Sequence, residues 1–178
     1  MAGLAQSLIG FIEARDHALM RKVHRWRAPK WIRLWMIAAT RGGDGWIWYL
    51  AGLILALFGG AEGLRTVARS GLAAGLGIGF FIFLKRAAGR RRPCTIEPHC
   101  WSTLLPPDQF SFPSGHTITA FAITLPVAQQ YPDAAPGLYF LAMSIAVSRI
   151  VLGMHFLSDV IAGGILGLLL ARFACALV

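Results

Sequence analysis

The segment "SRIVLGMHFLSDVIAGGILGLLLA", residues 148–171, begins with ionisable residues and continues as an almost purely apolar stretch. Arg149, His155 and Asp159 stand at its polar end. A helix that spans a bilayer needs about 17–25 mostly apolar residues, and this segment with the residues after it supplies them. Ionisable groups at membrane depth are costly and mark functional sites. The segment therefore predicts a membrane helix with a functional site at its beginning.

The rest of the chain has the composition of a membrane protein. Of its 178 residues 56% are hydrophobic, and the mean hydropathy is +0.60. Five apolar runs could cross a bilayer: about residues 45–61, 66–84, 113–130, 136–151 and 156–176. Backbone in lipid must satisfy its own hydrogen bonds, and the runs lack the alternation of a barrel. We expect an all-α integral membrane bundle of about five to six spans, forming one domain over residues 1–178.

Residues 1–44 differ from these runs, because basic and apolar residues are interleaved there at helical spacing. This pattern predicts two amphipathic helices in the membrane interface, separated at Pro29, with no catalytic role for His17 or His24. The opening "MAGLAQSLIGFIEARD" has neither a basic start nor a cleavage site, so we expect the spans themselves to direct insertion. Small residues four apart predict close helix packing, at Gly71, Gly75 and Gly79 and again in "GGILG", residues 163–167.

Charge and cysteine content exclude several functions. The net charge of +9 accompanies no nucleic-acid recognition motif, and basic residues between apolar runs are usual in membrane proteins, so we expect no nucleic-acid partner. Cys94, Cys100 and Cys175 make no disulfide framework, although the first two could pair in an oxidising compartment. With His99 they lack the spacing of a zinc site, so we expect no metal.

Three polar islands interrupt the apolar runs: "KRAAGRRRP" at residues 85–93, "PSGH" at 113–116 and "SRIVLGMHFLSD" at 148–159. A loop, residues 85–112, joins the first two islands without a crossing. Between the second and third islands the chain crosses the membrane twice. All three islands should therefore meet at one face of the membrane, with residues 85–112 as an active-site loop.

The islands together offer ligands for phosphate. Arg92 and Arg149 carry guanidinium forks that match phosphate oxygens, and Lys85 adds an ammonium. Ser114 and Gly115 directly precede an apolar run, so we expect them at a helix N-terminus, where free N–H groups favour an anion.

The imidazoles divide the chemistry. His155 and Asp159 stand at i and i+4, so we expect them on one helix face, where the carboxylate can fix the imidazole tautomer. The other ring nitrogen can then attack phosphorus, and His116 can protonate the leaving oxygen. We interpret the other charged side chains of the loop as solvated or non-catalytic: Arg86, Arg90, Arg91, Glu97 and Asp108.

At these residues the chain resembles the type 2 phosphatidic acid phosphatase (PAP2) superfamily. Its three motifs are Lys, six residues, Arg-Pro; Pro-Ser-Gly-His; and Ser-Arg, five residues, His, three residues, Asp, and every fixed position is present. The resemblance implies that His155 is a nucleophile that forms a phosphohistidine, supported by Asp159, with His116 as the acid. It implies a reaction without metal or other cofactor that vanadate inhibits, and five phosphate ligands: Lys85, Arg92, Ser114, Gly115 and Arg149.

The function that these features predict is hydrolysis of a lipid phosphate at the bilayer edge. Candidate substrates are polyprenyl (pyro)phosphate, phosphatidic acid and phosphatidylglycerol phosphate. A lipid phosphotransferase with the same phosphohistidine is the alternative, and a non-catalytic lipid-binding membrane protein is less favoured. Nothing in the sequence specifies an oligomeric state.

The resemblance implies a bacterial inner membrane, with the site on the periplasmic or external side. Many bacterial members have a full span before the amphipathic segment, whereas this chain begins at that segment. Residues 1–44 carry eight Lys or Arg, and by the positive-inside rule this charge favours a cytoplasmic site. We take the family's usual side as the expectation.

Overall fold

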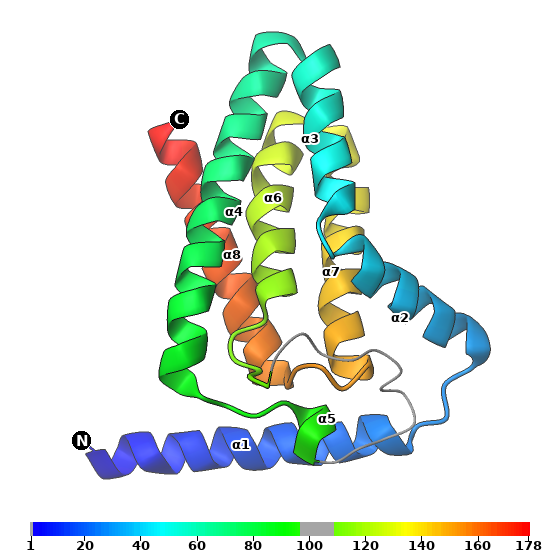
Figure 1. Ribbon diagram of the computed structural model, residues 1–178, viewed down its shortest axis with the longest axis vertical. Helices are drawn as coiled ribbons and strands as arrows, with labels where there is room; N and C mark the ends of the chain where they lie inside the picture. The colour runs from blue at the N-terminus through cyan, green and yellow to red at the C-terminus, as the bar shows by residue number, and fades with distance from the viewer. Residues whose placement is uncertain (1, 97–108) are drawn as a thin grey trace.

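The computed structural model describes residues 2–96 and 109–178. Within these ranges the chain forms eight α-helices and one short 3-10 helix, and its only β-structure is an isolated bridge between Arg91 and Phe110 (Figure 1). The helices in chain order are α1 (Ala2–Arg25), α2 (Lys30–Gly42), α3 (Trp46–Phe58), α4 (Gly60–Ala88), α5 (Pro93–Ile96), α6 (Gly115–Gln130), η1 (Pro132–Ala134), α7 (Ala135–Val151) and α8 (Leu157–Leu177).

Helix α6 lies at the centre of the bundle. It packs against α4, α7 and α8, while α3 lies beside α4 and α2 packs on α7. Small residues make up much of the core, and Ala73, Ala122 and Ala171 are completely buried where α4, α6 and α8 meet. Small side chains let helices approach closely, and close van der Waals packing matters in a membrane bundle because the hydrophobic effect contributes little between helices in lipid.

Two glycines of α8 lie directly against the backbone of α6. A Cβ atom on Gly167 would lie 2.5 Å from the carbonyl oxygen of Ile118, and one on Gly163 would lie 2.8 Å from that of Ser114. The packing predicted for "GGILG" is therefore confirmed.

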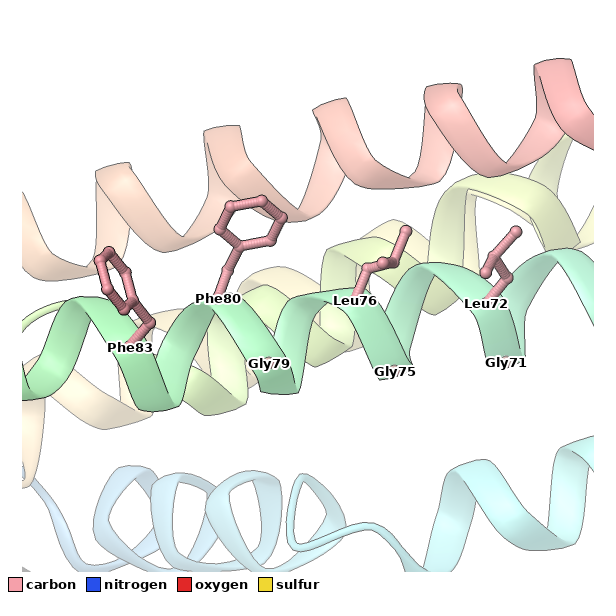
Figure 2. Close-up of a pocket in the computed structure, with 7 residues that line it drawn as sticks. All are labelled: Gly71, Leu72, Gly75, Leu76, Gly79, Phe80 and Phe83. Carbon is pink, nitrogen blue, oxygen red and sulfur yellow. The ribbon is translucent and has the colours of Figure 1, made fainter.

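The prediction for Gly71, Gly75 and Gly79 is wrong within this chain. Among the described residues, a Cβ atom on any of the three would meet nothing within 4 Å. They line a hollow of about 540 Å³ on the outer face of α4, where Leu72 and Phe80 project beside them (Figure 2). The glycine of α4 that packs against α6 is Gly77, where a Cβ atom would lie 2.7 Å from the Ile118 side chain.

In the part of the chain that the structure describes, three helical segments are long and apolar enough to cross a membrane: Gly60–Ala88, Pro132–Val151 and Leu157–Leu177. The remaining two predicted runs form α3, of 13 residues, and α6, of 16 residues. The helical membrane architecture is thus confirmed, while the number of five to six spans stays a prediction. Helix α4 also continues beyond its predicted end, so Lys85 belongs to its last turn and the loop begins at Gly89, in a left-handed conformation with φ of 57°.

The first two helices have the expected amphipathic character. Helix α1 lies across the lower end of the bundle in Figure 1, exposing apolar side chains such as Leu8 and Phe11 and burying Asp16 and Met20. Helix α2 begins directly after Pro29, which separates it from α1 as predicted.

Candidate active site

The three polar islands meet at the end of the bundle that α1 underlies. The C-terminal ends of α4 and α7 and the N-terminal ends of α6 and α8 all lie there (Figure 1). A cavity of about 470 Å³ opens between these ends and the start of α3. Five of the predicted site residues line it: Arg92, Gly115, His116, Arg149 and His155.

A tight turn between α7 and α8 presents His155 to the cavity. Gly153 has a φ of 68°, a left-handed conformation that glycine adopts without strain. The carbonyl of Arg149 accepts hydrogen bonds from the backbone N–H groups of Met154 at 2.9 Å and His155 at 3.0 Å, and these bonds close the turn. His155 therefore precedes α8, and the prediction that it shares a helix with Asp159 is wrong.

The two ring nitrogens of His155 have partners that specify one tautomer. Nδ1 lies 2.6 Å from the carbonyl oxygen of Ser111, which can only accept a hydrogen bond. Nε2 lies 3.1 Å from Nη1 of Arg92, which can only donate one. The proton must therefore sit on Nδ1, and the lone pair of Nε2 is directed to the guanidinium side of the cavity.

His155 is also held in its neutral form. Its side chain is 2% exposed. Burial, together with the guanidinium groups of Arg149 and Arg92, lowers its pKa from 6.5 to about 4, against the opposing effect of Asp159. At neutral pH the imidazole is uncharged, as a nucleophile must be.

Asp159 lies behind the imidazole, completely buried in the first turn of α8. Its Oδ2 accepts the backbone N–H of Phe156 at 2.8 Å and lies 3.8 Å from Nδ1 of His155. That separation suits an ion pair with a charged imidazolium and is too long for a hydrogen bond. The tautomer is therefore fixed by the Ser111 carbonyl, and Asp159 contributes charge.

Arg90 corrects the sequence-based interpretation of the basic cluster. Its side chain is only 17% exposed and pairs with Asp159 Oδ1 at 2.6 Å and Asp16 Oδ2 at 2.7 Å. It is buried because the chain after α4 turns beneath the first turn of α8. Arg86 and Arg91 are exposed, as predicted. Residues 97–108, with Glu97, His99, Cys100 and Asp108, lie outside the described residues.

Two short segments are paired to bring Arg92 and Ser111 to the imidazole. The backbone N–H of Ser111 donates to Arg90 O at 2.7 Å, and that of Arg92 donates to Gln109 O at 3.3 Å. The Arg92 side chain is 2% exposed and also donates to the carbonyl of Met154 at 3.0 Å. These contacts hold the guanidinium in place before any ligand binds.

The "PSGH" island begins a helix, as predicted. Ser114 is the N-cap of α6, and its backbone N–H donates to the carbonyl of Asp159 at 3.1 Å, which ties α6 to α8. Ser114 is completely buried, and its hydroxyl accepts a hydrogen bond from Thr117 at 2.9 Å. It supports the wall of the cavity, while Gly115 lines it and leaves helix N–H groups open to an anion.

His116 has a partner in the segment that connects α2 to α3, and Arg149 has a partner in the last turn of α2. Nε2 of His116 lies 2.9 Å from Oδ1 of Asp44, which also lines the cavity. Arg149 is 4% exposed and donates to the hydroxyl of Thr40.

Lys85 does not line the cavity. Its ammonium sits 4.7 Å from the centre of the Phe81 ring, and Phe81 rather than Lys85 lines the cavity. Within the described residues no group of three or more His, Cys, Asp or Glu side chains could hold a metal ion. The expectation of a reaction without metal stays a prediction.

Comparison with known proteins supplies the family. The model of the PAP2 superfamily matches residues 66–178. Decaprenylphosphoryl-5-phosphoribose phosphatase of Mycolicibacterium smegmatis is 33% identical over 117 residues, which are 64% of this chain and 63% of that protein. Lipid A 1-phosphatase of Rhizobium etli is 35% identical over 108 residues, 58% of this chain and 44% of that protein. The matches thus span less than two thirds of the length of either relative.

The fold is also similar to that of a solved PAP2 structure. The crystal structure of a transmembrane PAP2 type phosphatidylglycerolphosphate phosphatase from Bacillus subtilis matches with a TM-score of 0.73, covering 93% of this chain and 85% of that chain at 24% identity. The family model covers more than half of this chain and includes all three motifs, from Lys85 to Asp159. This apolar helical chain is a membrane protein and belongs to the PAP2 superfamily.

Proposed function

We propose that the protein is a membrane phosphatase that removes phosphate from a lipid phosphomonoester or pyrophosphate through a phosphohistidine on His155. The observation that carries the proposal is the pair of contacts on the imidazole. An acceptor on Nδ1 and a donor on Nε2 leave one neutral tautomer with its lone pair turned to two guanidinium groups. A nucleophile and the ligands for its electrophile then share one cavity.

The reaction follows from these positions. Phosphate binds against Arg92, Arg149 and the N–H groups at the start of α6, displacing the Arg92 contact from Nε2. Nε2 of His155 attacks phosphorus, and the bond from phosphorus to the leaving oxygen breaks as His116 gives that oxygen a proton. The imidazole now carries positive charge, and Asp159, 3.8 Å from Nδ1, stabilises it.

Hydrolysis reverses these roles. Neutral His116 takes a proton from a water molecule, whose oxygen attacks the phosphorus of the phosphohistidine. The bond from phosphorus to Nε2 breaks, phosphate leaves, and His155 returns to its neutral tautomer. Asp44, 2.9 Å from Nε2 of His116, stabilises the protonated state of that residue in the first half of the cycle.

The remaining wall of the cavity is apolar, which suits a lipid substrate. Tyr49, Ile78 and Ile82 line it on the side of α3 and α4, and these helices expose apolar side chains. The substrate classes that we propose are polyprenyl (pyro)phosphate, phosphatidic acid and phosphatidylglycerol phosphate. The relatives named decaprenylphosphoryl-5-phosphoribose phosphatase and lipid A 1-phosphatase support a lipid substrate.

The test is phosphate release by the detergent-purified protein in excess EDTA from a panel of these lipids. The His155→Ala variant serves as the negative control, and His24→Ala, which alters an imidazole that does not line the cavity, serves as the matched positive control. Release that survives EDTA and disappears only in His155→Ala supports the proposal. Equal release by His155→Ala, or none by the unmodified protein from any lipid, would overturn it.

We also propose that the protein lies in a bacterial inner membrane with the site on the periplasmic side. The family resemblance supports this side, although the basic N-terminal residues favour the other. Arg86 is exposed near the site, so Arg86→Cys in a chain whose native cysteines are replaced by serine would report the orientation. Labelling of intact cells by a membrane-impermeant thiol reagent is the expected result. Labelling only after lysis would place the site in the cytoplasm.

A further inference from the structure

Arg90 joins three segments that are far apart in the sequence. Its Nη2 lies 2.7 Å from Oδ2 of Asp16 on α1. Its Nη1 lies 2.6 Å from Oδ1 of Asp159 and 2.7 Å from the hydroxyl of Ser158, both in the first turn of α8. Asp16 is 5% exposed and Asp159 is fully buried, so these are charges largely removed from water.

A second set of contacts fastens α1 to the same turn of α8. The backbone N–H of Ser158 donates to Oδ1 of Asp16 at 3.1 Å, and the Ser158 hydroxyl donates to Oδ2. The Arg90 guanidinium lies 4.2 Å from the centre of the Phe156 ring, and His17 packs edge-on against that ring at 5.0 Å. Helix α1 is therefore joined to Phe156 and Ser158, which lie between the nucleophile His155 and the carboxylate of Asp159.

The two oxygens of Asp159 are held by different groups. Oδ1 accepts from Arg90, and Oδ2 accepts from the N–H of Phe156 while facing Nδ1 of His155. With both oxygens held, the carboxylate cannot rotate away from the imidazole. Removal of Arg90 would release one of these two contacts and leave a buried carboxylate with no cation from that side.

The charges of the cluster also suit a role in the reaction. A buried carboxylate keeps its charge only when a cation or hydrogen bonds stabilise it, and Arg90 provides both. Asp16 shares the same guanidinium, so Asp16, Arg90 and Asp159 together carry one net negative charge. That charge is available to the imidazolium that forms when His155 is phosphorylated.

We propose that Asp16 and Arg90 are positioning residues of the reaction, through which helix α1 holds the Asp159 carboxylate oriented and ionised for His155. The inference rests on the proposed function, because it concerns the same reaction. Neither residue lines the cavity, so their effect is expected on turnover rather than on substrate binding.

The test compares kcat and KM for phosphate release from one lipid phosphate. Asp16→Asn and Arg90→Gln should each lower kcat by about tenfold, the value of one charge-assisted hydrogen bond, with KM within about twofold. Arg90→Lys keeps the charge and should recover part of the loss. The matched controls are exposed neighbours, Glu13→Gln on α1 and Arg91→Gln in the loop, and both should retain the unmodified kcat.

A second comparison separates positioning from mere stability. In an Asp159→Asn background the effect of Arg90→Gln should shrink to about twofold or less, because both changes act on the same carboxylate. Asp16→Asn combined with Arg90→Gln should be no slower than Arg90→Gln alone. Undiminished loss in the Asp159→Asn background would overturn the inference, as would an unchanged kcat in both Arg90→Gln and Arg90→Lys. Absence of turnover in the unmodified protein would instead overturn the proposed function on which it rests.

Discussion

Alanine at Gly163 would push the first turn of α6 away from α8. A Cβ atom there would lie 2.8 Å from the carbonyl oxygen of Ser114 and 3.3 Å from Cβ of Thr117. Both neighbours are backbone or branched atoms that cannot rotate away. The same turn of α6 carries Gly115 and His116, so the displacement reaches the phosphate-binding N–H groups and the acid together.

The size of the effect follows from the geometry. Ordinary contact begins at 3.4 Å, so the Ser114 carbonyl must move by about 0.6 Å. Since a displacement of about 1 Å in a catalytic site costs roughly 100-fold in rate, we expect kcat/KM to fall by about tenfold. The assay is initial-rate phosphate release in detergent, with a thermal unfolding midpoint to show that the variant is folded.

Gly164 supplies the matched control. The nearest atoms to a Cβ there, on Phe121 and Thr117, lie at 3.7–3.8 Å, which is ordinary contact. Gly164→Ala should therefore keep the unmodified rate. Equal activity of Gly163→Ala and Gly164→Ala would show that the contact between α6 and α8 does not set the geometry of the site.

Three further predictions concern the imidazoles. His116→Ala should abolish turnover of lipid phosphates but spare part of the rate with an aryl phosphate, whose acidic leaving group needs no proton; equal losses with both substrates would refute its role as acid. Asp44→Asn should lower kcat by about tenfold with a lipid phosphate and by less with the aryl phosphate, since it removes the partner of His116. Neutral His155 contributes its whole share of the free energy of unfolding above about pH 6.5, and that share should fall by about 3 kcal/mol towards pH 4. The reason is that His155 is protonated in the unfolded chain over this range but stays neutral in the folded protein. Denaturant titrations at a series of pH values should show this slope, and His155→Gln should remove it.

The spacing of the motifs predicted much of the site because each island stands at the end of an apolar run. For that reason one cavity is lined by five of the predicted residues: Arg92, Gly115, His116, Arg149 and His155. The number of membrane crossings between the islands was sufficient to predict that they meet at one end of the bundle.

The residues that sequence reasoning missed act through contacts that no local pattern encodes. Ser111 contributes a backbone carbonyl, which its side-chain identity does not reveal. Arg90 is indistinguishable in sequence from Arg86 and Arg91, and only the path of the chain beneath α8 decides which of them is buried. Asp44 lies 72 residues from His116; its one local signal is an acid in "RGGDG", immediately before the first apolar run.

The glycine stripe of α4 shows the same limit in packing. Four-residue spacing identifies a smooth helix face, and Gly71, Gly75 and Gly79 do form one. Which face meets α6 depends on how α4 is rotated about its axis, and in the fold Gly77 takes that contact. Spacing specifies a surface, while its partner is set by the tertiary arrangement.

The most direct test of the central claim is to trap the covalent intermediate. The protein would be mixed with a ³²P-labelled lipid phosphate, quenched in alkali within one turnover, and digested for peptide mapping by mass spectrometry. We expect one phosphate, stable to alkali and labile to acid, on the peptide that contains His155, and none in His155→Ala. Label on another residue, or turnover by His155→Ala without any label, would contradict the account.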